Sequence, residues 1–215
     1  MKINFLKLFL LILPLTMVAC SDDDDDTGST KKDDDGDTTS FAISSTSFTD
    51  GGKIAVKHAC ANWTGGVMTS PQFSWSNPPT DTAKYALIMD DEFADDCGPA
   101  NPGMDDYCVH WGVFNVPTST TSYAEKLTPS TVSSPVIQGY NYATTQIYAG
   151  VCPPQAHDKY RTTIYALKST MPTMTLADTN YNTNSGITRK RFESVYSAHI
   201  LDSATITGTF DPADH

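Results

Sequence analysis

The segment from Cys108 to Pro117 reads CVHWGVFNVP, and it gives the clearest indication of a buried β-strand in the chain. It is rich in β-branched and aromatic residues, and a proline ends it. Alternation places His110, Gly112, Phe114 and Val116 on one face and Val109, Trp111 and Val113 on the other. Both faces are apolar, which predicts a central strand. His110, an ionisable ring near the strand's start, is then either a core histidine with one hydrogen bond or part of a binding site.

Strand-like segments recur on both sides of this one. They occupy residues 53–59, 72–76, 84–91, 145–150, 160–168 and 203–210. Residues 187–201 are predicted to be helical, because Phe192, Val195, Tyr196 and His199 recur at helical spacing. Many short strands, one late helix and frequent turn residues predict a mostly β fold, a sandwich or barrel with a helical cover, over residues 41–215.

The first 19 residues have the pattern of a secretory signal peptide. Lys2 and Lys7 precede the apolar run FLLILPLTMVA, which is shorter than the roughly 20 residues of a membrane-spanning helix. The run ends in MVAC, which resembles a bacterial lipobox, so Cys20 is predicted to be lipidated. Ordinary signal cleavage beside an incidental cysteine is the alternative.

Residues 20–40 are predicted to be a disordered tether behind the lipidated cysteine. They contain nine aspartates and two lysines but no aromatic or aliphatic residue, so they cannot bury apolar surface. An acidic run in this position resembles the surface-export signal of Bacteroidota lipoproteins. We therefore expect a lipoprotein of the outer membrane, on the cell surface, held to the membrane only through its lipid. Metal binding by the acidic run is the alternative.

Charge limits the partners of the remaining domain. The net charge of −11 divides into +2 for the signal, −7 for the tether and −6 for residues 41–215. An acidic domain on an acidic tether argues against a nucleic-acid partner, which needs a basic surface. No cysteine and histidine spacing typical of zinc sites occurs, so no metal ion and no cofactor is expected.

Two further segments carry polar side chains that could complete a site. The segment LIMDDEFADD runs from a strand into carboxylates and places Asp90 at the strand's end. The segment YAGVCPPQAHDKY brings Gly150, Pro153, His157 and Tyr160 together just before another strand. Each pattern is weak when it is taken alone.

Taken in order, these segments resemble the phosphatidylethanolamine-binding protein family, in its bacterial Raf-kinase-inhibitor-like branch. The matching stretches are SPQFSWSNPP (70–79), YALIMDDEFA (85–94), HWGVFNVP (110–117), YAGVCPP with HDKYRTTIYAL (148–167) and SAHILDSATITGTF (197–210). The resemblance implies a β-sandwich with a C-terminal helix beside one mouth, and a small anion pocket at that mouth.

The resemblance also implies which residues form this pocket. They are Asp90, His110, Gly150, Pro153, His157 and Tyr160, with Glu92 in place of a second aspartate. In this arrangement Asp90 would fix the tautomer of His110 and keep its ring protonated. The histidine–tyrosine pair is one residue longer than the family pattern, so either His157 is displaced or Asp158 faces the pocket.

The cysteines suggest disulfides, since an exported protein meets oxidising conditions. The loop between Asp90 and His110 is longer than in bacterial relatives, and Cys97 and Cys108 lie near its ends. We predict a disulfide between these two cysteines. Cys60 and Cys152 would then be free thiols or a second disulfide.

The resemblance favours a non-catalytic module that binds a small anion, a phosphate or carboxylate headgroup. The alternative is an interaction protein that inhibits a protease or another protein target. A metal-assisted hydrolase using Asp90, His110 and His157 is a third reading. It is disfavoured because the sequence has neither a G-x-S-x-G nor an H-E-x-x-H motif.

Overall fold

The computed structural model describes residues 40–92, 107–153, 158–180 and 187–214. The strands are β1 (Ala42–Ser44), β2 (Gly52–Lys53), β3 (Phe73–Ser76), β4 (Lys84–Asp91), β5 (Cys108–Pro117), β6 (Ser122–Tyr123), β7 (Ile137–Gln138), β8 (Asp158–Leu167) and β9 (Ile200–Phe210). The helical elements are α1 (Arg189–Val195) and the 3-10 turns η1 (Val56–His58), η2 (Pro129–Thr131), η3 (Ala177–Thr179), η4 (Ser197–His199) and η5 (Pro212–Asp214).

The predicted signal peptide, Cys20 and nearly all of the predicted tether lie outside the described residues. Within the described ranges, no helix has the length and apolar character needed to cross a membrane.

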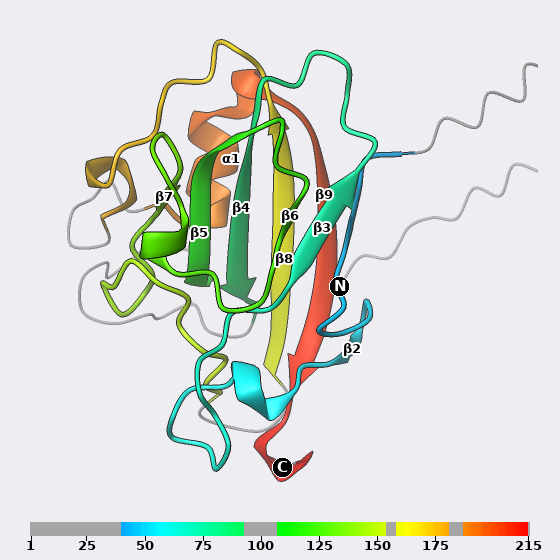
Figure 1. Ribbon diagram of the computed structural model, residues 1–215, viewed down its shortest axis with the longest axis vertical. Helices are drawn as coiled ribbons and strands as arrows, with labels where there is room; N and C mark the ends of the chain where they lie inside the picture. Colours follow the sequence, from blue (N-terminus) through cyan, green and yellow to red (C-terminus); the bar gives the residue numbers. More distant parts are fainter. Residues whose placement is uncertain (1–39, 93–106, 154–157, 181–186, 215) are drawn as a thin grey trace, which may run out of the picture. The chain divides into compact units, whose positions relative to one another are not determined.

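The strands form two sheets, which confirms the predicted mostly β sandwich. The larger sheet has the order β2-β9-β8-β4-β5-β7 and the smaller has the order β1-β3-β6. Figure 1 shows β3 and β6 in front of the larger sheet and α1 behind it. Because β4 is antiparallel to both β5 and β8, it ends where those two strands begin. We call this end, which is at the bottom of Figure 1, the lower end of the large sheet.

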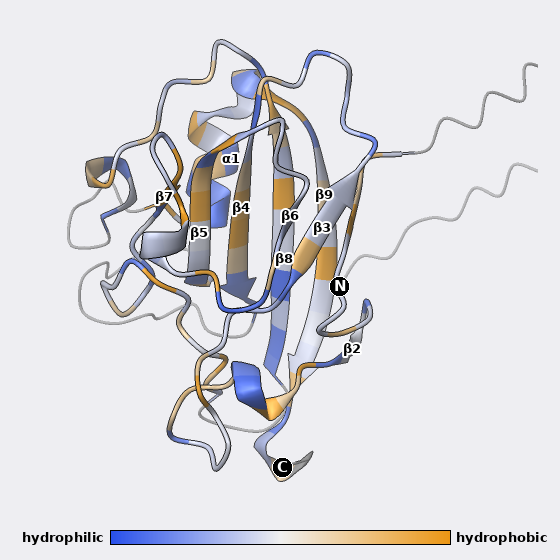
Figure 2. Cartoon of the chain, in the orientation of Figure 1, coloured by the Kyte–Doolittle hydropathy of each residue, from blue (hydrophilic) through white to orange (hydrophobic). Residues whose placement is uncertain are grey.

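Apolar side chains cover both faces of the large sheet. Between the two sheets, Trp111 of β5 packs in one cluster with Phe73 and Trp75 of β3. On the opposite face, Ile88 of β4 packs in a second cluster with Phe192 of α1. Figure 2 shows the apolar middle of β4 changing to hydrophilic colouring at its lower end. The core therefore fixes the strands, and their lower ends are left to carry polar groups.

Two predicted strands are not strands in the structure. Residues 53–59 alternate in polarity, but β2 ends at Lys53 and the chain turns into η1. Ile54 and His58 are both buried although the segment leaves the sheet, so burial here does not require a strand. Residues 145–150 form no strand either, although the amide of Ala149 donates a hydrogen bond to the carbonyl of His110 (2.8 Å).

The predicted helix over 187–201 is also shorter than expected. It begins after Thr188, whose side chain accepts a hydrogen bond from the amide of Arg191 (3.1 Å), a typical N-cap. It ends at Val195, and β9 already begins at Ile200. Phe192 is buried as predicted, but Val195 is 56% exposed, so the predicted apolar face of the helix is only partly buried.

Candidate functional site

Three strand ends bring polar side chains together at the lower end of the large sheet. Asp91, the last residue of β4, pairs with Cys108 at the start of β5 and with Tyr160 near the start of β8. Asp158 lies two residues before Tyr160 and therefore shares its face of the sheet. This face is the one that packs toward the small sheet, because Tyr160 belongs to the cluster between the two sheets.

A β-bulge places His110 among these groups. Met89 pairs with Trp111, whereas the next residue, Asp90, pairs with Val109, so His110 is an extra residue on β5. Bulges interrupt the strict alternation of a strand and redirect a side chain, and they are common beside active sites. The face predicted for His110 from simple alternation is therefore not the one that it occupies.

The buried ring of His110 is held from several sides. Its Nδ1 atom lies 2.9 Å from the carbonyl oxygen of Ala149. Its ring centroid is 4.8 Å from that of Tyr142 and 5.1 Å from that of Tyr160, the latter edge to face. Its Nε2 atom lies 3.8 Å from Oδ2 of Asp91, beyond direct hydrogen-bond range. We refer to His110, Asp91, Tyr160, Asp158 and Tyr142 as the His110 cluster.

The contacts of His110 determine its tautomer. A carbonyl oxygen can only accept, so Nδ1 carries the proton of the neutral ring and Nε2 is its unprotonated nitrogen. Burial lowers the pKa of His110, while the carbonyls of Ala149 and Gly150 and the charge of Asp91 act in the opposite direction. The ring is therefore neutral at neutral pH, which contradicts the expectation that a carboxylate keeps it protonated.

Tyr160 and Asp158 complete the polar cluster. The hydroxyl of Tyr160 accepts a hydrogen bond from the amide of Cys152 (3.2 Å). It is also hydrogen-bonded to Asp91, and burial together with that contact raises the pKa of Tyr160 far above its ordinary value. Burial and the nearby charge of Asp91 raise the pKa of Asp158 to about 6. The charge of the cluster consequently changes in weakly acidic solution.

A rigid loop forms one wall of the cluster. A side chain at Gly150 would place its Cβ 2.5 Å from the amide nitrogen of Cys60, so only glycine fits this close approach. A disulfide joins Cys60 to Cys152, with their Cα atoms 5.4 Å apart. Pro153, the next residue, is buried beside it. The loop that carries Gly150 and the amide of Cys152 is thus covalently tied to the segment after η1.

The sequence left Cys60 and Cys152 as either free thiols or a second disulfide, and the structure shows them joined by a disulfide. Cys108 is disulfide-bonded as well. Its predicted partner, Cys97, lies outside the described residues, so their pairing stays a prediction. Peptide mapping of the unreduced protein would test it.

The structure does not place Asp90 in the cluster. Successive side chains of a strand point to opposite faces, and Asp90 lies on the face toward α1, whereas Asp91 faces His110. The carboxylate of Asp90 accepts hydrogen bonds from Arg161 (Nε at 3.0 Å, Nη2 at 2.6 Å) and from Nε of Arg189 (3.1 Å). The predicted partnership of Asp90 with His110 is wrong by one residue, and Asp91 holds that position.

Glu92 also lies outside the cluster. Its carboxylate forms ion pairs with Nζ of Lys159 (2.7 Å) and Nη1 of Arg161 (3.0 Å). It therefore extends the ionic network of Asp90 rather than facing His110. His157 lies outside the described residues, and its predicted role stays a prediction.

Two members of the cluster, Asp91 and Tyr142, were not among the residues selected from the sequence, whereas Asp158 was named there as the alternative to His157. The two-residue period of a strand relates Asp158 to Tyr160, so the sequence contained a signal for Asp158. For Asp91 the signal was the shared face with Met89, a core residue. Tyr142 reaches His110 from a loop, and no local pattern could have indicated that contact.

The sequence profile described as "Phosphatidylethanolamine-binding protein" matches residues 44–211. The chain belongs to the phosphatidylethanolamine-binding protein family. Members of this family are generally binding proteins, so the cluster is a candidate binding site.

Individual relatives agree with the family assignment. The chain is 30% identical over 169 residues to a UPF0098 protein of Chlamydia muridarum, covering 79% of this chain and 97% of the relative. A phosphatidylethanolamine-binding protein homologue from Chlamydia trachomatis has a similar structure, with a TM-score of 0.59 and 26% identity over 80% of this chain and 97% of the homologue. Escherichia coli YbcL has the same fold, with a TM-score of 0.62 and 22% identity over 80% of this chain and 98% of YbcL.

Proposed function

We propose that the chain is a non-catalytic binding protein whose His110 cluster holds a small phospho-headgroup. The observation that supports this most is the convergence of His110, Asp91 and Tyr160 from three strand ends. Each of these side chains is buried, and each contacts another member or the 149–152 backbone. Donors and acceptors held in this way lose little entropy when a ligand binds.

The carboxyl groups of the cluster restrict the kind of headgroup. A bare phosphate would meet Asp91 and Asp158, and like charges in a desolvated site repel strongly. A headgroup that also carries an ammonium group avoids this conflict. Its ammonium can lie against the carboxylates, and below neutral pH its phosphate can accept a hydrogen bond from the protonated ring of His110. We therefore favour a zwitterionic headgroup such as phosphoethanolamine over a simple anion.

The titration of Asp158 and His110 predicts how the affinity for the ligand changes with pH. As the pH falls below about 6, Asp158 becomes neutral. The imidazole of His110, whose pKa is lowered by burial, also gains a proton as the pH falls. Both changes make the site less negative, so the affinity for the phosphate group should rise as the pH falls.

Calorimetry with glycerophosphoethanolamine tests the proposal, because a phosphodiester keeps one charge from about pH 5 to about pH 8. His110→Ala removes a charge-assisted hydrogen bond and should weaken binding about ten- to a hundredfold at the lower pH. His199→Ala, a histidine outside the cluster, is the matched control. Equal affinity in all three proteins, independent of pH, would show that His110 is only a core residue.

The cellular location of the protein is part of the same proposal. The lipobox-like MVAC and the acidic run after it support a lipoprotein anchored through Cys20 on the outer membrane. The collinear motifs support the bacterial Raf-kinase-inhibitor-like branch of the family. On this reading the domain binds its ligand at the cell surface.

A further inference from the structure

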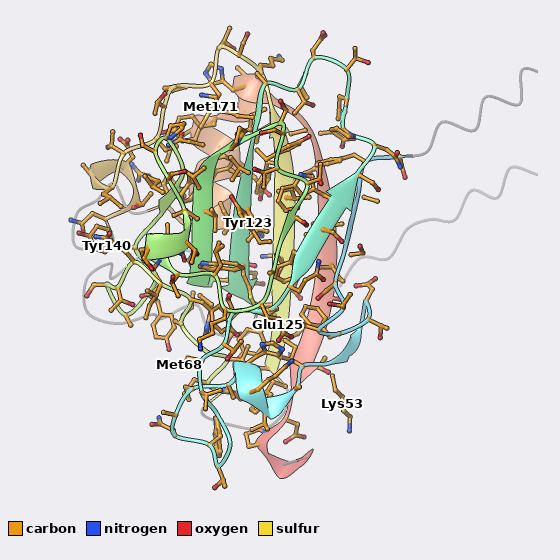
Figure 3. All side chains as sticks on the ribbon, viewed as in Figure 1. Lys53, Met68, Tyr123, Glu125, Tyr140 and Met171 are labelled. Carbon is orange, nitrogen blue, oxygen red and sulfur yellow. A yellow bond between two sulfur atoms is a disulfide. The ribbon has the colours of Figure 1, made fainter. Side chains whose placement is uncertain are left out.

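A recess lies in the described part of the chain, apart from the residues of the His110 cluster. Three segments form it, namely residues 67–70, 126–128 and 147–148, and its volume is about 260 Å³. Its walls include Leu127 and the buried ring of Tyr148. Figure 3 labels Met68, which lines this recess, toward the lower end of the molecule and below Glu125.

Most of the exposed large apolar side chains among the described residues line this recess. Among the described residues, the exposed large apolar side chains are Val67 (66%), Ile147 (39%), Met68 (42%) and Val195 (56%). All except Val195 line this one recess. Scattered exposed apolar residues need no explanation, but a concentration of them around a hollow is typical of a binding site.

The backbone of the recess is held in an unusual conformation. Met68 and Lys126 both have positive φ angles, 51° and 65°, which side-chain-bearing residues rarely adopt. Hydrogen bonds hold both positions: the amide of Met68 donates to Ala59 (3.0 Å), and the amide of Lys126 donates to the carbonyl of Ser70 (3.1 Å). Strain of this kind persists where the surroundings enforce it, and it is concentrated at ligand sites. The walls are therefore preformed.

The charge at the rim favours an anion. Lys126 is exposed and lines the recess. The neighbouring carboxylate of Glu125 is already engaged by Nζ of Lys57 (2.6 Å) and by the hydroxyl of Ser47 (2.9 Å). A cation beside an apolar hollow complements a molecule with an apolar body and one negative group.

We propose that this recess binds a small monocarboxylate with an apolar body, such as a short-chain fatty acid. The apolar body would lie against Leu127, Tyr148 and Ile147, and the carboxylate would pair with Lys126. An apolar cavity of about 150 Å³ accommodates benzene. A recess of about 260 Å³ therefore fits a chain of several carbons but not a full-length acyl chain. This site does not depend on the function proposed for the His110 cluster.

Titration calorimetry of the full chain with hexanoate tests the proposal. Val67→Asp places a negative charge in the wall and should weaken hexanoate binding at least tenfold. Val195→Asp makes the same change at an exposed valine outside the recess and should leave the affinity within twofold. Lys126→Gln should reduce the preference of the protein for hexanoate over the neutral hexanol, because the alcohol does not need the cation.

Three results would overturn the proposal. One is no hexanoate binding at millimolar concentrations by wild-type protein with a normal circular dichroism spectrum. Another is an equal loss of affinity in Val67→Asp and Val195→Asp. The third is that glycerophosphoethanolamine displaces hexanoate from the wild type and that His110→Ala abolishes hexanoate binding. This result would place hexanoate at the His110 cluster.

Discussion

Replacing Asp90 with asparagine separates the two acidic residues at the end of β4. Asp90 is fully buried and faces α1, where Arg161 and Arg189 donate three hydrogen bonds to its carboxylate. Asparagine keeps the shape of the side chain but removes its charge and leaves both guanidinium groups without this partner. We expect the variant to be less stable than the wild type while its His110 cluster remains intact.

The size of the loss follows from these contacts. Removing one partner from a buried ion pair costs about 3–5 kcal/mol. The lower end of this energy range applies here, because Arg161 remains paired with Glu92 and Arg189 remains paired with Glu193. Burial raises the pKa of Asp90 despite the two arginines, so desolvation of its carboxylate outweighs their attraction, and the loss arises because the two buried guanidinium groups are left without this partner. A loss of about 3 kcal/mol lowers the melting temperature by about 6–12 °C in a domain of this size.

Urea denaturation followed by tryptophan fluorescence measures this change. Asp90→Asn should lower the midpoint without altering the slope, and it should still bind glycerophosphoethanolamine. Asp91→Asn is the control, and it should weaken binding. It should lose less stability than Asp90→Asn, because Asp91 lies near the like charge of Asp158. A midpoint for Asp90→Asn equal to that of the wild type would refute the ionic network. Loss of binding in Asp90→Asn but not in Asp91→Asn would refute the assignment of faces.

Further predictions concern stability and anchoring. Asp158 has its pKa raised to about 6 from 3.8, so the folded state keeps a proton that the unfolded state has released, and stability falls as the pH rises through that window. Asp158→Asn should therefore melt at a higher temperature than the wild type at pH 7.5 but not at pH 3.5; no difference at either pH would contradict this. The Cys60–Cys152 disulfide spans 92 residues of chain, so the double serine variant should lose about 4–5 kcal/mol in the chain-entropy model, measured by urea denaturation, and an unchanged midpoint would show that the bond adds no stability. Cys20→Ser should move the protein from the membrane fraction to the soluble fraction in cell fractionation, and a variant that stays in the membrane fraction would disprove the lipid anchor.

The sequence by itself determined the sheet that carries the candidate site. The strands around Met89, Trp111 and Ile164 consist of apolar residues long enough and continuous enough to be buried, and this property is local. The order of the motifs along the chain was sufficient to indicate the family. His110 and Tyr160 were selected as candidate site residues because they match the motifs of that family, and each is a polar group at the end of such a strand.

Only the tertiary structure decided which acid faces His110. A bulge between Met89 and Asp90 adds one residue to the pairing, and the sequence pattern does not reveal it because both Asp90 and Asp91 are aspartates. The partner of Cys60 was equally beyond the sequence. Cys152 lies 92 residues away, and a disulfide depends on the distance between Cα atoms in the folded chain rather than along it. Local patterns report burial, whereas the choice of partner depends on how distant segments pack.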